Sequence, residues 1–146
     1  MTVRIPRSKV FYAFSNQLTP VAHVQQNEAI IFDTYDCFEG QVRKPEDMLG
    51  ELDWAHINPA TGPVYIEGVQ PGDVLRIEIR DIRVDEQSVV VCMPGSGAIG
   101  DVIRQTEAVV MPIWNGQAVY KEKVRLPIDP IDRKSTRLNS SHVSES

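Results

Sequence analysis

The chain has 146 residues, 42% of them hydrophobic and 24% charged, which is ordinary usage for one globular domain or one lobe of a larger one. Its formal net charge of -5 argues against the basic surface of a nucleic-acid-binding protein, and no run of about 18 apolar residues is present to cross a membrane. The N-terminal residues lack the apolar stretch of a secretory signal. Because Cys37 and Cys92 fit no metal-binding or redox spacing, we expect reduced thiols in a cytoplasmic protein. From the charge and the lack of a long apolar run, we expect neither nucleic-acid nor membrane partners.

Short apolar runs rich in valine and isoleucine recur between proline, glycine, asparagine and aspartate residues, which predicts a chain built mainly of β-strands. The predicted strands are Lys9–Phe14, Ala29–Asp36, Pro63–Glu67, Val74–Val84, Ser88–Cys92 and Ala108–Ile113, with a hairpin or an edge strand over Ala118–Leu126. One short helix is predicted over Pro45–Gly50, which begins with proline and acids and ends with glycine. We therefore predict an incomplete antiparallel β-sandwich, jelly-roll-like, with one short helix.

Residues 74–84 give the clearest strand pattern of the chain. Apolar and charged side chains alternate over the first half of this segment, so one face is expected to be buried and the other wet. The alternation changes phase at Ile82, which predicts a β-bulge near Arg80–Asp81. Pro71–Asp73 before the strand is typical of a type II turn, because proline fixes φ at one position and glycine accepts a positive φ at the next.

The last residues differ in composition from the rest of the chain. Residues 133–146 read RKSTRLNSSHVSES, with five serines and only Leu138 and Val143 as aliphatic residues. Such a stretch cannot bury a face, so we expect it to be disordered, and it resembles vector or adapter read-through at the end of a truncated gene. The predicted organisation is therefore a β-rich portion over residues 1–132 and a disordered foreign tail over residues 133–146.

Asp36 is the acid with the most unusual setting. It shares a predicted strand face with Ile30 and Phe32, and a carboxylate that follows apolar residues is costly to bury unless it meets a metal or a hydrogen-bond donor. This pattern makes Asp36 a candidate catalytic or metal-binding residue. The alternative is structural: the strand leaves the sheet at Thr34, and Asp36 opens a turn with Gly40.

The loop Asn58–Pro63 is the second candidate, because two prolines and a glycine make it stiff and poor in free donors. Such a loop can present Asn58, Thr61 and backbone N–H groups to a ligand, and it can equally serve as a rigid connection. His56 precedes the loop and could act as a base or a metal ligand. A single histidine without a second one at metal-binding spacing favours a structural role.

Several of these stretches together resemble the acetamidase/formamidase family. Thr34–Gln41 is similar to the family segment T-x-D-x-F-x-x-Q, and Asn58–Pro63 (NPATGP) begins the family's most distinctive N-terminal signature. That signature continues through Val64–Gly68 (VYIEG) to Pro71–Leu75 (PGDVL), and Leu126–Pro130 resembles the lead-in to a later P-M-I-G segment. The resemblance spans about residues 9–130, and a chance match of so long a combined motif is improbable.

The resemblance implies a β-sandwich amidase that hydrolyses short aliphatic amides, such as formamide and acetamide, to a carboxylate and ammonia. It also implies a divalent metal cofactor, zinc, which lowers the pKa of a bound water, and assembly into homo-oligomers. Carried over to this sequence, it makes Asp36 the catalytic residue and a metal ligand. Gln41, Asn58 and Thr61 become substrate-binding residues.

Family members are roughly twice as long as this chain, and their downstream half carries G-G-N-M-D-type and G-D-x-H…G-D-G-E segments that are absent here. We therefore expect the chain to be an N-terminal portion that is inactive by itself. Two alternatives remain open. The chain could be a non-catalytic β-sandwich module that binds small ligands, although aromatic residues are only 7% of it, or a structural fragment that is stable only with a partner chain.

Overall fold

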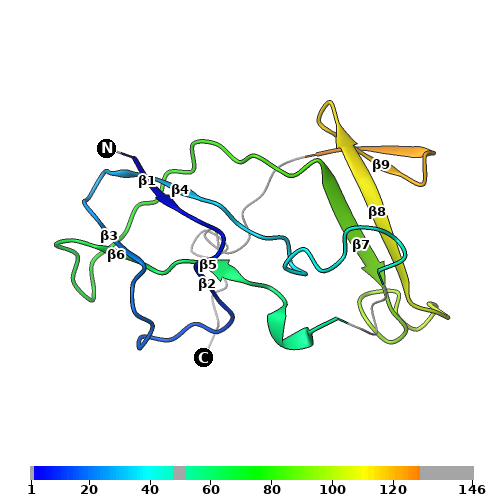
Figure 1. Cartoon of the computed structure of the whole chain (residues 1–146), viewed down its shortest axis with the longest axis horizontal. Helices are drawn as coiled ribbons and strands as arrows, with labels where there is room; N and C mark the ends of the chain where they lie inside the picture. Colours follow the sequence, from blue (N-terminus) through cyan, green and yellow to red (C-terminus); the bar gives the residue numbers. More distant parts are fainter. Residues whose placement is uncertain (1, 48–51, 129–146) are drawn as a thin grey trace. The chain divides into compact units, whose positions relative to one another are not determined.

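The structure, a computed structural model, describes residues 2–47 and 52–128. Its regular elements are ten strands and one 3-10 turn (Figure 1). They are β1 (Thr2–Ile5), β2 (Val10–Phe11), β3 (Ala22–Val24), β4 (Ala29–Phe32), η2 (Trp54–His56), β5 (Ala60–Thr61), β6 (Val64–Ile66), β7 (Gln87–Cys92), β8 (Glu107–Trp114), β9 (Gln117–Tyr120) and β10 (Val124–Pro127). The prediction of a mainly β protein with open, incomplete sheets is confirmed. Among the helices described here, none is long and apolar enough to cross a membrane.

These residues form two compact units. The first contains residues 2–42 and 52–77, and the second contains residues 43–47 and 78–128. Three two-stranded ladders make up the first unit: β1 with β4, β2 with β5, and β3 with β6. The second unit is a four-stranded antiparallel sheet in the order β10-β9-β8-β7. The candidate site residues all lie in the first unit, so its ladders decide how they are placed.

Two ladders of the first unit differ from the antiparallel expectation. β1 pairs with β4 in parallel, with Thr2 opposite Ala29, and β3 pairs with β6 in parallel, with Ala22 opposite Val64. Parallel strands need a long connection that returns the chain to the same end of the sheet. In the part of the chain that the structure describes, loops, strands of other ladders and the short 3-10 turn η2 make these connections, and no α-helix is among them.

Most predicted strands are present, and three of them are shorter than predicted: β2, β4 and β6. Ser88–Cys92 and Ala108–Ile113 correspond closely to β7 and β8, and Ala118–Leu126 is a hairpin of β9 and β10. The predicted helix is not seen where it can be followed: Pro45–Asp47 forms a turn, in which Asp47 Oδ2 accepts hydrogen bonds from the backbone N–H groups of Arg43 (2.7 Å) and Lys44 (3.0 Å). The remainder of that prediction, residues 48–50, lies outside the described residues.

The strand predicted over Val74–Val84 is wrong, and with it the bulge near Arg80–Asp81. The segment contains no strand, and no backbone hydrogen bond joins it to any other described residue. An alternating pattern forms a strand only where a second strand is available to pair with it. The described residues of this chain supply no such strand for residues 74–84. The turn before the segment is as predicted: Gly72 has φ of 100°, and the Asp73 N–H donates to the Gln70 carbonyl at 3.1 Å.

Few apolar side chains are buried in the part of the chain that the structure describes. In the first unit these are Ile5, Val24, Val42 and Leu52, and in the second they are Met111 and Ala118. Val42, with no exposed surface, directly follows Gln41 and anchors the end of the candidate site segment. A core this small makes the polar contacts between loops important for holding the first unit together.

An ion pair ties the start of the chain to the end of β4. Arg4 donates from Nε and Nη2 to the two carboxylate oxygens of Asp33 at 2.8 and 2.7 Å, and this lowers the pKa of Asp33 while raising that of Arg4. Because the folded pKa of Asp33 lies below its ordinary value of 3.8, the pair stabilises the fold above that value and ceases to do so as the pH falls through the lowered pKa. We expect Arg4→Met to reduce the loss of stability in acid. Urea unfolding between about pH 2 and pH 6 measures this, and equal acid sensitivity in both proteins would contradict it.

Candidate functional site

The first part of the site is a tight turn that follows β4. The strand ends at Phe32, and Asp36 then accepts hydrogen bonds at Oδ1 from the backbone N–H groups of Phe38 (2.8 Å) and Gly40 (3.0 Å). Its carbonyl accepts a third from the Glu39 N–H at 3.1 Å. The structural alternative for this residue, a turn between Asp36 and Gly40, is therefore present. Its catalytic and metal-binding roles stay predictions, and both now concern a carboxylate whose orientation is fixed.

Gln41 clamps this turn to the segment that contains η2. Its Nε2 donates to the carbonyls of Asp53 (3.3 Å) and His56 (3.2 Å), and its Oε1 accepts from the Asp53 N–H at 2.8 Å. Asp53 in turn caps η2, because its Oδ1 accepts from the Ala55 N–H at 3.0 Å. All three of these bonds from Gln41 go to backbone groups, so this side chain positions the site. Contact between Gln41 and a substrate stays a prediction.

The loop Asn58–Pro63 is joined to the same turn. The Asn58 N–H donates to the Cys37 carbonyl at 2.7 Å, and the Thr61 hydroxyl donates to the Asp33 carbonyl at 2.9 Å. Asn58 has φ of 54°, a left-handed conformation that asparagine tolerates better than most residues. Two segments predicted separately from the sequence are thus parts of one substructure, and the roles of Asn58 and Thr61 toward a substrate stay predictions.

Four ionisable side chains lie together beside this turn, and sequence reasoning did not bring them together. The Tyr12 hydroxyl donates to Glu39 Oε1 at 2.8 Å, and the Tyr12 ring stacks on His56 with 5.0 Å between centroids. His56 Nδ1 faces two carboxylates, 3.5 Å from Asp53 Oδ2 and 3.9 Å from Glu39 Oε2. Glu39 has φ of 55°, so the turn holds it in a strained conformation. In the sequence, the only signal that pointed to Glu39 was its place inside the T-x-D-x-F-x-x-Q segment.

Two pKa values in this region are shifted. Burial, aided by the hydrogen bond to Glu39, raises the pKa of Tyr12 to about 12. Burial also raises the pKa of the Cys37 thiol, with the neighbouring Asp36 as a second cause. A thiol with a raised pKa carries less thiolate at neutral pH, so Cys37 is a poor nucleophile.

We expect the bond between Tyr12 and Glu39 to be visible in a titration of phenolate absorbance. Tyr12→Phe should remove the component that titrates near pH 12, and Glu39→Gln should move it toward the ordinary value of 10. Since the folded pKa is raised, the interaction stabilises the fold below about pH 10 and is lost as the pH rises through about 12. A component unmoved by Glu39→Gln would show that Glu39 does not hold the phenol.

The described residues do not form a complete metal site. Nowhere in residues 2–47 and 52–128 do three or more His, Cys, Asp or Glu side chains come together in a way that could hold a metal ion. Zinc sites take three or four protein ligands, so Asp36 could contribute only one member of such a set. The metal stays a prediction of the family resemblance, and it would need ligands beyond the described residues.

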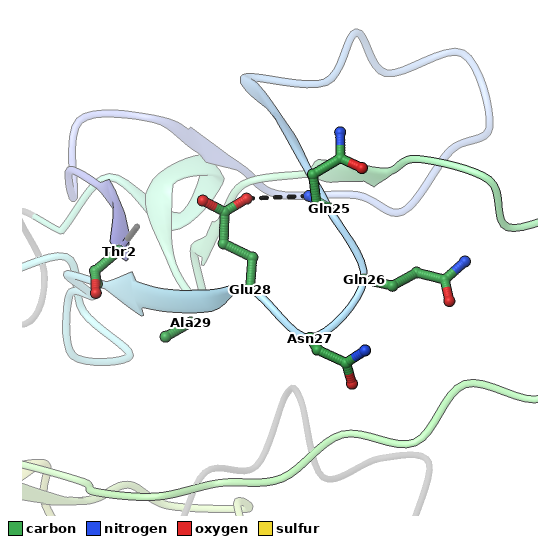
Figure 2. A pocket seen from close by; sticks show the side chains of 6 residues that line it. All are labelled: Thr2, Gln25, Gln26, Asn27, Glu28 and Ala29. Carbon is green, nitrogen blue, oxygen red and sulfur yellow. Dashed lines mark hydrogen bonds between the residues drawn. The ribbon is translucent and has the colours of Figure 1, made fainter.

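A shallow hollow lies elsewhere on the first unit, at the turn that connects β3 and β4 (Figure 2). It is lined by Thr2, Gln25, Gln26, Asn27, Glu28 and Ala29. Glu28 Oε2 accepts from the Gln25 N–H at 3.0 Å, so this acid closes the turn. None of the predicted site residues lines the hollow, and its lining contains no aromatic ring on which a sugar could stack.

Comparison with known proteins agrees with the motifs. The model of the acetamidase/formamidase family matches residues 6–127. The chain is similar to an acetamidase from Bacillus halodurans, with 36% identity, a TM-score of 0.83 and coverage of 86% of this chain and 43% of that one. It is also similar to a predicted acetamidase/formamidase from Thermoanaerobacter tengcongensis, with 34% identity, a TM-score of 0.83 and coverage of 88% and 42%.

A third solved structure, an acetamidase from Yersinia enterocolitica, is 20% identical with a TM-score of 0.67 over 87% of this chain and 43% of that one, which shows a common fold. No curated protein sequence matches the chain. The chain thus spans less than half the length of the solved structures it matches. Because the family match runs through both candidate segments and covers most of the sequence, the chain belongs to the acetamidase/formamidase family.

Proposed function

We propose that this chain is part of an amidase that hydrolyses short aliphatic amides, such as formamide and acetamide, to a carboxylate and ammonia. Family membership supports the proposal. The observation that carries it is the joining of the turn at Asp36 to the loop Asn58–Pro63, through the bonds from Asn58 to Cys37 and from Thr61 to Asp33. If these two family segments carry the catalytic residues, they are expected to lie together in the fold.

We assign Asp36 as the base that takes a proton from the attacking water. A carboxylate acts as a base only if it is aimed at the proton it accepts, and two backbone N–H groups hold Asp36 Oδ1 in one orientation. Gln41 is a positioning residue in this scheme, because its amide fixes the segment around η2. Asn58 and Thr61 border the site and are the proposed contacts to the amide group of the substrate.

Cleavage of an amide also requires a proton for the departing nitrogen, because an amide anion is a very poor leaving group. His56 is the imidazole attached to this substructure. Asp53 and Glu39 lie 3.5 and 3.9 Å from its Nδ1, and its ring stacks on Tyr12, which leaves Nε2 on the opposite edge to pass a proton. We assign this role to His56.

The family resemblance adds a divalent metal, zinc, which would lower the pKa of the attacking water and polarise the amide carbonyl. Asp36 is the residue of this chain proposed to face it. The incomplete ligand set supports no further assignment, and none of the roles given above to Asp36, Gln41 and His56 depends on the metal. Small amides are the proposed partners, and a homo-oligomer is the proposed assembly of the complete protein.

A chimera tests the proposal. Residues 1–128 replace the matching part of the Bacillus halodurans acetamidase, and ammonia release from formamide and acetamide is measured with and without added zinc. We expect the chimera to be active and the 146-residue chain alone to be inactive. Activity of the chain alone at the chimera's rate would contradict the division of the site, and a folded but inactive chimera would contradict the proposed function.

A further inference from the structure

The turn between β8 and β9 contains a chemically reactive pair of residues. Trp114 pairs with Gln117 across this hairpin, so Asn115 and Gly116 alone make the connection (Figure 1). Their φ values are 48° and 70°, and positive φ at both central positions is what a type I′ turn requires. Asparagine followed by glycine suits this turn, and it also places a side-chain amide beside a backbone nitrogen that no neighbouring side chain shields.

We propose that Asn115 is a site of spontaneous deamidation, which converts it to aspartate and isoaspartate and opens the hairpin. The Gly116 nitrogen attacks the side-chain carbonyl carbon of Asn115, so a C–N bond forms while the bond from that carbon to Nδ2 breaks. The proton of the Gly116 nitrogen passes through solvent to the departing nitrogen, which leaves as ammonia. Water then opens the cyclic imide at one of its two carbonyl carbons, and opening at the backbone carbonyl gives isoaspartate. Water is the only co-reactant.

The surroundings of Gly116 favour the attack. Its N–H donates no backbone hydrogen bond to another described residue, so no such bond has to break before the nitrogen reacts. A Cβ built on Gly116 would meet no atom within 4 Å apart from its chain neighbours, so the turn has space in which its backbone can change conformation. Asn115 is exposed, which gives water access to the imide.

Two other asparagines show what the residue after Asn115 contributes. Asn27 and Asn58 are left-handed as well, with φ of 63° and 54°. Pro59 follows Asn58 and has no N–H, so a neutral imide cannot form there. Glu28 follows Asn27, and its N–H already donates to a backbone carbonyl at 3.2 Å while its side chain hinders the attack. Of these three asparagines, Asn115 alone combines the left-handed conformation with an unhindered nitrogen.

Deamidation that gives isoaspartate is expected to open the hairpin. Isoaspartate carries the chain through its side-chain carbon, which adds one methylene to the backbone of a loop that a type I′ turn limits to two residues. The turn sets the register in which the buried Ala118 faces Ile113. The Gly116 carbonyl also accepts a hydrogen bond from the Ile128 N–H at 2.8 Å. A longer backbone at this turn should weaken both the register and the bond to Ile128.

Incubation of the 146-residue chain at mildly alkaline pH, followed by peptide mapping with mass spectrometry, tests the site. The peptide that contains Asn115 should acquire aspartate and isoaspartate, while Asn58 stays unchanged and Asn27 converts at a small fraction of the rate. Asn115→Gly keeps a residue suited to a positive φ and should abolish the modification, whereas the matched variant Asn27→Gly should leave it unaltered. An Asn115 that stays intact in the folded chain overturns the proposal, as does equally fast conversion at Asn27.

Hydrogen exchange tests the opening of the hairpin. The Ile128 amide should exchange faster in the isoaspartate form than in the parent, because its bond to the turn is weakened. Asn115→Asp adds the same negative charge without lengthening the backbone, so its Ile128 amide should exchange like that of the parent. Equal exchange in the isoaspartate form and the parent would show that the turn absorbs the extra methylene, and the hairpin would not open. None of these results depends on the proposed amidase activity.

Discussion

Asp36→Asn is expected to leave the turn after β4 intact while it reduces amide hydrolysis by the chimera about a hundredfold or more. Asparagine keeps an oxygen at the position of Oδ1, so it can still accept the hydrogen bonds from Phe38 and Gly40 that fix the turn. It has no basic carboxylate with which to take a proton from water. The stability of the variant should therefore match that of the parent, and kcat should carry the loss. Urea unfolding and ammonia release measure the two effects separately.

Asp36→Ala is the matched control for the structural role. Alanine removes the acceptor, so the turn should lose about 1 kcal/mol of stability in addition to the activity. If Asp36→Asn retained full activity and Asp36→Ala lost it together with stability, Asp36 would serve only the turn. Asp33→Asn offers a second comparison in the same unit, because it changes a carboxylate whose two oxygens are occupied by Arg4. It should affect stability and leave kcat unchanged.

The sequence predicted well those strands whose partners are close along the chain. β8, β9 and β10 follow one another through short turns, so the apolar runs in them meet their partners locally. Residues 74–84 have a stronger alternation than any of these and yet form no strand. Alternation records that two faces differ in polarity, whereas a ladder also requires a second strand, and the pattern alone does not contain that information. The parallel pairing of β1 with β4 escaped prediction for a related reason: its direction is decided by a long connection.

The candidate site was predicted in its parts and missed in its assembly. The family motifs identified Asp36, Gln41, Asn58 and Thr61, but the task of Gln41 became visible only in the fold, where its amide bonds to backbone groups 12 and 15 residues away. Tyr12 lies 27 residues from Glu39, its hydrogen-bond partner, and no spacing rule links them. Motifs thus nominate candidate residues, and long-range contacts show which of them the fold brings together.

Gln41→Leu is expected to lower the free energy of unfolding of the first unit by about 2–3 kcal/mol, because it removes three hydrogen bonds worth about 1 kcal/mol each and leaves backbone groups of Asp53 and His56 without them. Hydrogen exchange at the Asp53 and Ala55 amides should accelerate, since the segment around η2 loses its clamp. Urea unfolding together with exchange measured residue by residue tests this. Unchanged exchange at Asp53 would contradict the role given to Gln41.

Gln41→Glu is the sharper variant, because it keeps the size of the side chain and changes only its hydrogen bonding. At neutral pH its carboxylate would still accept from the Asp53 N–H but would face the carbonyls of Asp53 and His56, so it should be less stable than Gln41→Leu. Carbonyl neighbours raise the folded pKa of such a carboxyl above its unfolded value of about 4.3. The protonated acid can donate to one carbonyl, so Gln41→Glu should gain stability relative to Gln41→Leu as the pH falls through that raised pKa. A gap between the two variants that does not change with pH would show that the two carbonyls do not lie against this side chain, and the clamp that joins the two family segments would have to be sought elsewhere.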